Sequence, residues 1–253
     1  LEAQIDIQNQ QLIDRAIPME SERLHFSLKN GSIIIKPLFN NTLLIRNGIR
    51  KSSSPFQSFV AMTGGVDAYC LQAAGFTIQS ILEYRPKEAR DKMDLTETGA
   101  LNAIANVKAK YLFNEDITRI NWQHVKSIIQ NDEPVGLLHL SLQCDDFSNS
   151  KANSLKQRSI DNLDTTADLV YDGLRLIETV QPATVVIENV PNFSSSAAGD
   201  LLRIKLRKWG YHVSEAVLDA RQYNGNTSRK RYYLVASVWP GFEMPTPQPA
   251  SNK

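Results

Sequence analysis

The sequence predicts a doubly wound α/β domain, in which a mainly parallel, seven-stranded sheet is covered by helices on both faces. From residue 56 onward, short apolar or β-branched runs alternate with longer amphipathic segments, as in parallel sheets with crossover helices. The chain has 253 residues, and 42% of them are hydrophobic. That is enough for one domain of this class with its own core, and it leaves little room for a second large domain.

Seven apolar runs are the predicted strands, and four amphipathic segments are the predicted helices. The strands are expected at residues 56–62, 77–82, 111–113, 135–142, 184–187, 212–218 and 232–238. The helices are expected at residues 68–74, 122–130, 166–179 and 197–208. Leu169, Leu174, Leu176 and Ile177 form part of an apolar stripe on the third helix.

The segments on either side of this pattern differ from it in composition. Residues 1–55 are rich in Gln, Asn and Ser, and their short apolar runs at 32–38 and 42–45 predict a few strands. Residues 241–253 are rich in proline and predict a linker or exit segment. We therefore expect an N-terminal segment of unknown role over 1–55, one main domain over 56–240, and the linker.

Composition excludes several classes of protein. The 28 basic and 27 acidic residues nearly cancel, so the chain is neither a polybasic tail nor an acidic solvating segment. Two cysteines, Cys70 and Cys144, exclude a disulfide framework and a cysteine-rich zinc site. Nothing at the start of the given sequence reads as a signal peptide, and its most apolar stretch, near 135–142, is too short to span a bilayer. We expect a cytoplasmic protein with no membrane and no metal among its partners.

Ligands of doubly wound sheets bind beyond the carboxyl ends of the strands, so the residues after each run are the candidates for chemistry. The first run ends in a Gly-Gly turn, which lets a ligand approach the backbone closely. An acidic residue follows the second run, where it can accept hydrogen bonds from ribose hydroxyls, and another follows the third run, where it can accept from an exocyclic amino group. The alternative is a plain turn for the Gly-Gly pair, a solvated carboxylate after the second run and a helix cap after the third. The candidates are Thr63, Gly64, Gly65, Glu83, Tyr84, Asp116 and Ile117.

The fourth and fifth strands end in residues that suggest catalysis. Cys144 follows the fourth strand; a lone cysteine is most often a small buried hydrophobe, but this one lies at the ligand edge. Glu188 and Asn189 follow an apolar strand, where a carboxyl group needs partners or a proton. An acid role for Glu188 is the functional interpretation, and a cap of the next segment is the structural one.

Basic residues are concentrated near the C-terminal end of the predicted sheet. Residues 203–231 contain eight of them and two acidic residues, which is an electrostatic footprint suited to phosphate. A solvated helix face is the alternative. Arg229 and Arg231 directly precede the last strand, so we expect them at the site.

The order of these elements resembles the cytosine-C5-specific DNA methyltransferase family, from about Phe59 to Pro245. The strongest matches are a nucleophile motif at 144–148, an acid motif at 188–190 and an arginine motif at 228–231. The family's Pro-Cys-Gln is Gln143-Cys144-Asp145 in this chain, and its preceding Gly-Gly-Pro is Leu140-Ser141-Leu142. The chain is therefore similar to variants with a non-standard nucleophile motif, such as those of phages or mobile elements.

The resemblance implies a class I, Rossmann-like methyltransferase fold that uses S-adenosylmethionine. It implies that the Cys144 thiolate adds to cytosine C6 and that Glu188 assists at N3. Asn189 would orient the acid motif, and Ser148, Arg229 and Arg231 would bind the substrate. The cofactor contacts implied are Thr63, Gly64, Gly65, Glu83, Tyr84, Asp116, Ile117, Gln143 and Leu169. The partner is DNA, whose target base must leave the duplex to be reached.

Two further expectations follow from the resemblance. The target-recognition domain of the family is not found, and the chain begins with Leu1, so we expect a fragment or one subunit of a split enzyme. A second chain or a missing C-terminal segment would carry recognition. An RNA (tRNA) cytosine-C5 methyltransferase and a non-catalytic nucleic-acid-binding subunit with a decayed cofactor site are the alternative functions. In a bacterial or phage setting the protein would associate with the nucleoid, in restriction–modification, phage protection or regulation.

Overall fold

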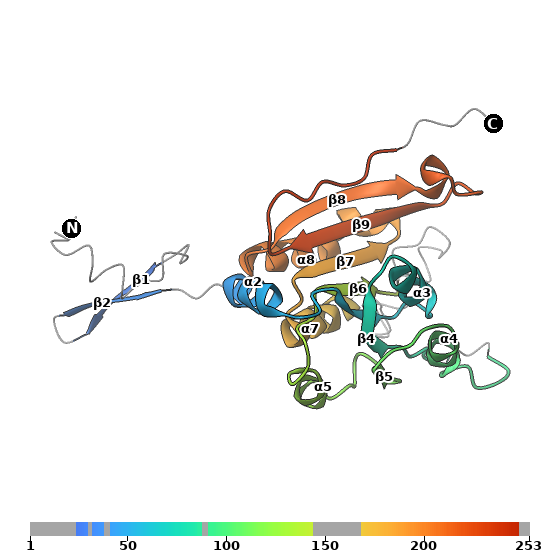
Figure 1. Ribbon diagram of the computed structural model, residues 1–253. Coiled ribbons are helices and arrows are strands. Elements are labelled where there is room, and N and C mark those ends of the chain that lie inside the picture. Colours follow the sequence, from blue (N-terminus) through green and yellow to red (C-terminus); the bar gives the residue numbers. More distant parts are fainter. Residues whose placement is uncertain (1–23, 30–31, 38–40, 88–90, 144–167, 248–253) are drawn as a thin grey trace, which may run out of the picture.

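The computed structural model of the chain describes residues 24–29, 32–37, 41–87, 91–143 and 168–247. Its main body is a seven-stranded sheet with helices on both faces (Figure 1), which confirms the predicted fold class. All seven predicted strands are present. They are β3 (Gln57–Ala61), β4 (Thr77–Leu82), β5 (Tyr111–Phe113), β6 (Leu137–Ser141), β7 (Thr184–Asn189), β8 (His212–Asp219) and β9 (Lys230–Ser237).

The strand order is β5-β4-β3-β6-β7-β9-β8. Strands β3 to β7 pair in parallel, whereas β9 runs antiparallel to both β7 and β8. The order reverses beside β3, which creates the topological switch point where such sheets bind ligands. Because β9 is reversed, its first residues lie at the same edge as the last residues of β6 and β7.

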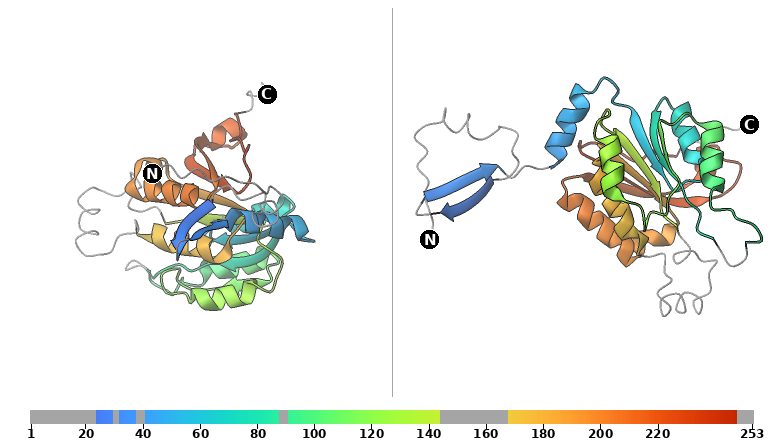
Figure 2. Two further views of the ribbon diagram at one scale, coloured as in Figure 1. Left: turned by 90° about the vertical axis from the view of Figure 1, so that its left-hand side faces the viewer. Right: turned by 90° about the horizontal axis from the view of Figure 1, so that it is seen from below.

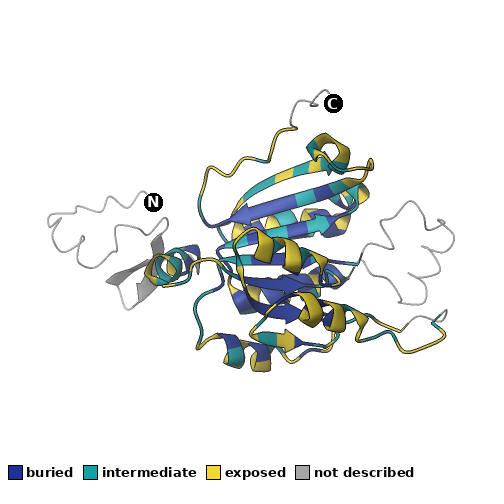
Figure 3. Ribbon diagram, turned by 45° about the vertical axis from the view of Figure 1, so that its right-hand side comes forward, coloured by how far each residue is buried: buried dark blue, intermediate teal, exposed yellow. Residues whose placement is uncertain are grey.

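Helices cover the two faces of the sheet unequally (Figure 2). α3 (Val66–Ala73) and α4 (Thr98–Asn106) pack over a small cluster on one face. α5 (Trp122–Ile129), α7 (Leu169–Val180) and α8 (Ala197–Lys208) pack over the main core on the other. The buried residues of α7 recur at helical spacing, which is why this segment folds as an amphipathic helix. Figure 3 shows the buried strands between exposed outer helix faces.

The N-terminal part of the described chain is partly different from the prediction. β1 (Leu24–Lys29) and β2 (Ser32–Pro37) pair with each other in a separate two-stranded antiparallel sheet. The strand expected at 42–45 is wrong, because these residues belong to α2 (Asn41–Lys51). Thr42 and Ile45 are buried and Ile49 packs on the core, so the relevant spacing is three and four residues rather than two.

Two short 3₁₀ helices complete the edge where the strands end. η1 (Pro191–Ser195) follows β7, and η2 (Ala220–Tyr223) follows β8. Helix α4 was not predicted, because its buried face consists of Ala100 and Ala103 and gives almost no apolar signal. No described helix has the length and apolar character that crossing a membrane requires.

Candidate functional site

The loop between β3 and α3 has the left-handed backbone that its glycines permit. Gly64 and Gly65 have φ angles of 64° and 85°. A Cβ atom on Gly65 would lie 2.9 Å from the backbone Cα and N of Ala103, so only glycine fits there without displacing α4. Asn102 of α4 also donates a hydrogen bond from its Nδ2 to the Gly64 carbonyl at 2.6 Å. The loop is therefore clamped against α4.

Glu83, directly after β4, also binds the loop between β3 and α3. Its Oε1 accepts hydrogen bonds from the Thr63 backbone N–H at 2.8 Å, the Thr63 hydroxyl at 3.1 Å and the Gly65 N–H at 3.3 Å. The residue is 3% exposed, and this burial raises the pKa of its carboxyl group, although the hydrogen bonds oppose the shift. The Oε2 atom lies 3.1 Å from where a Cβ atom on Gly99 would be, so glycine at 99 keeps space beside it.

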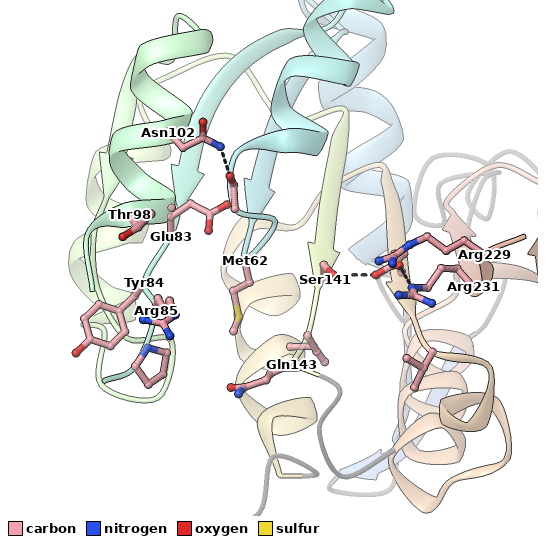
Figure 4. A pocket seen from close by; sticks show the side chains of 16 residues that line it. Met62, Glu83, Tyr84, Arg85, Thr98, Asn102, Ser141, Gln143, Arg229 and Arg231 are labelled. Carbon is pink, nitrogen blue, oxygen red and sulfur yellow. Dashed lines mark hydrogen bonds and ion pairs between the residues drawn. The ribbon is translucent and has the colours of Figure 1, made fainter. Parts of the chain in front are cut away.

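A cavity of about 670 Å³ opens beside Glu83 and runs along the strand ends to Glu188 (Figure 4). Four of the predicted cofactor contacts line it, namely Gly64, Glu83, Tyr84 and Gln143. Three of the predicted catalytic residues line it as well, namely Glu188, Arg229 and Arg231. The remaining lining residues are Met62, Arg85, Pro86, Thr98, Gly99, Asn102, Ser141, Leu142 and Val190.

Glu188 is held by two different side chains at the far side of this cavity. Arg231 Nε lies 2.8 Å from Oε1, and the Ser141 hydroxyl donates to Oε2 at 2.9 Å. The Glu188 and Arg231 side chains are 21% and 22% exposed, so the pair is accessible to a ligand but partly shielded from water. The partners that a carboxyl group at the end of a buried strand requires are thus a cation and a hydroxyl.

Asn189, the residue after Glu188, is 1% exposed and connects two strand ends. Its Nδ2 donates to the Leu142 carbonyl at 3.2 Å, and its Oδ1 accepts from the Val190 N–H at 2.8 Å. This amide therefore fixes the backbone just before Gln143. Asn189 is not among the described residues that line the cavity of about 670 Å³, and both of these contacts are with the protein's own backbone.

The segment that precedes β9 is organised by Asp219. Its Oδ1 accepts from the backbone N–H groups of Arg221 at 3.1 Å and Arg229 at 3.0 Å, and its Oδ2 accepts from the Ser228 hydroxyl at 2.6 Å. These hydrogen bonds, that of Ser228 first, lower the pKa of Asp219. The turn delivers Arg229 to the wall of the cavity.

A second cavity, of about 620 Å³, lies on the other side of the Ser141, Glu188, Arg229 and Arg231 wall. Thr63 lines this second cavity rather than the first. Its remaining lining is Val66, Asp67, His139, Leu218, Ala220, Tyr223, Tyr233 and Pro245. Tyr233 has a raised pKa, chiefly because burial disfavours the phenolate and because the negative Glu188 lies near it.

Four predicted cofactor contacts, namely Gly65, Asp116, Ile117 and Leu169, line neither of these two cavities. Asp116 uses its Oδ1 to accept from the N–H and hydroxyl of Thr118, both at 2.9 Å, and these bonds lie in the turn at 117–119, so Asp116 does not cap a helix. Ile117 and Leu169 are buried in the main core. Cys144 and Ser148 lie outside the described residues, so their roles remain predictions.

Sequence reasoning missed several polar residues of this region, among them Ser141, Asp219, Asp67 and His139. The first two had a signal: Ser141 lies three positions before the proposed nucleophile, and Asp219 ends a strand. The Asp67–His139 contact joins residues 72 positions apart and had no signal in the sequence.

The chain is similar in sequence to known proteins. The family model "C-5 cytosine-specific DNA methylase" matches residues 78–244, about two thirds of the chain. The DNA-cytosine methyltransferase of Escherichia coli K12 is 33% identical over 125 residues, which are 43% of this chain and 26% of that protein. The tRNA (cytosine(38)-C(5))-methyltransferase of Schizosaccharomyces pombe is 35% identical over 80 residues, 31% of this chain and 24% of that protein.

A solved structure gives the same fold. The S. pombe Dnmt2 methyltransferase matches with a TM-score of 0.53 and 19% sequence identity, over 74% of this chain and 52% of that chain. The match thus spans about half of the length of that structure and less of the two sequence relatives.

Proposed function

Because the chain belongs to the C-5 cytosine-specific DNA methylase family, we propose that it transfers a methyl group from S-adenosylmethionine to C5 of a cytosine base in DNA. The observation that carries the proposal is the cavity of about 670 Å³, which has Glu83 on one side and Glu188 with Arg231 on the other (Figure 4). One side offers an acceptor for ribose hydroxyls, and the other an acid and a cation for a polar base.

The residues on the Glu83 side fit the cofactor. Glu83 is a buried carboxylate whose Oε2 lies beside the space that Gly99 keeps open, and Gly64 lets a ligand approach the backbone. The ring of Tyr84 can cover the adenine. S-adenosylmethionine, when bound, supplies an electrophilic methyl group. Gln143 would contact it from the opposite wall, while Thr63, Gly65, Asp116, Ile117 and Leu169 remain predicted contacts outside this lining.

The chemistry we propose begins with Cys144. C5 of cytosine is a weak nucleophile, so the thiolate adds to C6 and the displaced electrons make C5 nucleophilic. Glu188 donates a proton or a hydrogen bond to N3, where negative charge develops. After C5 has received the methyl group, with the donor's sulfonium leaving as a thioether, the C5 proton passes to a solvent water, the electrons of the C5–H bond re-form the C5–C6 double bond, the C6–S bond breaks, and the thiolate of Cys144 is restored. Arg229 and Arg231 raise the thiolate fraction of a thiol whose ordinary pKa is about 8.5.

The target base must enter this site from outside a duplex. Extrusion costs a few kcal/mol, which contacts with the nucleic-acid backbone must offset. Arg229 and Arg231 lie on the wall that both cavities share and are the cations we assign to the target nucleotide. Ser148 would contact its phosphate or base. A recognition segment in the same polypeptide or in a second chain would complete the partner set.

The test is methyl transfer from radiolabelled S-adenosylmethionine by the complete natural polypeptide. Duplex DNA that contains 5-fluorocytosine should trap a covalent adduct, because fluorine at C5 cannot leave as the proton does. The adduct should be absent for Cys144→Ser and present for Cys70→Ser, which removes the exposed cysteine of α3. Methyl transfer without a Cys144-dependent adduct would overturn the covalent mechanism.

A second candidate function is methylation of cytosine in tRNA. The tRNA-methylating relative from S. pombe favours it, since its matched segment is 35% identical to this chain. Parallel assays with duplex DNA and with tRNA separate the two substrates. No S-adenosylmethionine binding by calorimetry and no transfer to either substrate would instead support the non-catalytic subunit.

A further inference from the structure

Ser141 is the last residue of β6 and the direct neighbour of Glu188. The parallel register of β6 and β7 pairs these two residues, so their side chains leave the sheet on the same face. The Ser141 hydroxyl donates to Glu188 Oε2 at 2.9 Å, whereas Arg231 binds Oε1 (Figure 4). Each oxygen of the carboxyl group thus has its own partner, from a different strand.

We propose that Ser141 is a positioning residue that holds the Glu188 carboxyl group in its working orientation during methyl transfer. The inference rests on the proposed function. The terminal torsion of a glutamate side chain is broad, so a single partner leaves the carboxyl plane free to rotate. Two donors on two oxygens fix the plane, and catalysis at N3 requires such fixed geometry.

The hydroxyl has a property that Arg231 lacks. A serine hydroxyl can donate to a carboxylate or accept from a carboxylic acid, whereas a guanidinium group can only donate. Glu188 passes between these two forms if it gives a proton to N3 and takes it back. Ser141 can hold the carboxyl group in both forms, and because it is neutral it adds no charge to the site.

A second contact between the same strand ends makes the arrangement rigid. The Asn189 amide donates to the Leu142 carbonyl, one residue after Ser141. Adjacent residues of β7 are therefore tied to adjacent residues at the end of β6, once through a side chain and once through the backbone. Ser141 lines both cavities, so its hydroxyl lies at the surface where the base and the cofactor would meet.

The experiment compares Ser141→Ala, Ser141→Thr and Ser80→Ala in the complete natural polypeptide. We expect Ser141→Ala to lower kcat by about ten- to a hundredfold, with the KM for S-adenosylmethionine and the Tm almost unchanged. Threonine keeps the hydroxyl in a strand and should restore most of kcat. Ser80 is the control serine, since it is fully buried in β4 and its hydroxyl has no hydrogen-bond partner among the described residues.

A double-mutant cycle tests whether Ser141 acts through Glu188. In a Glu188→Gln background, Ser141→Ala should cause no further loss of kcat, because residues that act as a unit are non-additive. The same loss in both backgrounds would overturn the proposal, as would full activity of Ser141→Ala. These results presuppose an active wild type; a wild type inactive on cytosine in both DNA and tRNA overturns the proposed function itself, and this inference with it.

Discussion

The imidazole Nε2 of His139 lies 2.9 Å from the Asp67 Oδ2, and this contact joins the middle of β6 to the first turn of α3. The two side chains are 10% and 40% exposed. The mostly buried His139 ring thus has the Asp67 carboxylate, at the second cavity, as the hydrogen-bond partner of its Nε2. The pair connects the sheet to the helix that follows the glycine loop.

Asp67→Ala should lower the free energy of unfolding by about 1–3 kcal/mol, because it leaves a buried polar group without its partner. Urea denaturation measures the change. In a His139→Leu background the same substitution should cost much less, since the ring is no longer there to satisfy. Equal costs in the two backgrounds would show that the contact contributes nothing to stability.

Gly65→Ala should destabilise the fold more than Gly64→Ala does. Both residues have positive φ, so alanine at either costs about 1–2 kcal/mol in backbone strain. A Cβ atom at 65 also collides with Ala103, whereas one at 64 meets nothing within 4 Å. Overpacking adds about 1–3 kcal/mol at 65 alone. Denaturant unfolding of the two variants isolates this difference, and equal losses would contradict it.

Glu83→Gln should weaken the binding of S-adenosylmethionine about ten- to a hundredfold, because a hydrogen bond to a charged group is lost. Titration calorimetry measures this affinity. The hydrogen bonds that Thr63 and Gly65 donate to residue 83 should survive in this variant, since the glutamine amide oxygen can accept them in place of Oε1. Unchanged affinity would remove Glu83 from the proposed cofactor site.

Glu83 should also affect how stability depends on pH. Burial raises its folded-state pKa above the ordinary 4.5, so the folded state holds the proton more tightly than the unfolded state does. Its contribution to stability is complete below the ordinary value and is lost as the pH rises through the raised one. Relative to the wild type without cofactor, Glu83→Gln should therefore gain stability over that window, and a constant difference would contradict the shift.

Asp219→Ala should release the segment that carries Arg229. The variant removes the acceptor of two backbone N–H groups and one hydroxyl, so hydrogen exchange at the Arg221 and Arg229 amides should accelerate. Asp219→Asn keeps an oxygen for these amides and should largely preserve their protection. Because the pKa of Asp219 is lowered, the protection of these amides in the wild type, relative to their intrinsic exchange rates, should fall only as the pH drops through that lowered value, below the ordinary 3.8.

The sheet could be predicted from the sequence because its strands are short, mainly apolar runs, and amphipathic segments of helical period separate several of them. The predicted helix at 197–208 matches α8 residue for residue. Helix α4 was not predicted, because its close contact with the glycine loop requires small residues, and alanine and glycine give no periodic apolar signal. The segment 42–45 was predicted as a strand because such a short run fits both the strand period of two and the helical period of 3.6. Only Ile49, four positions after Ile45, continues the helical pattern.

The charge pattern was predictive only in part. Arg229 and Arg231 lie at the site, but Arg203 binds Glu215 and the Ser194 carbonyl inside the fold. Lys205, Arg207 and Lys208 end α8, which runs from η1 at the site edge back to the start of β8 at the opposite edge of the sheet. The eight basic residues of 203–231 are close in the sequence, but the fold places them in different parts of the structure. They therefore do not form one phosphate-binding face.

The reversed direction of β9 determines where the chain goes after the sheet is complete. β9 ends at Ser237, beside the first residue of β8 and far from the site. The next residues return along β8, since the Phe242 carbonyl accepts from Ser214 and the Pro245 carbonyl accepts from Tyr223. Pro245 already lines the second cavity. The segment that follows β9 thus returns to the edge of the sheet where the reaction is proposed to occur, and it forms part of the cavity wall there.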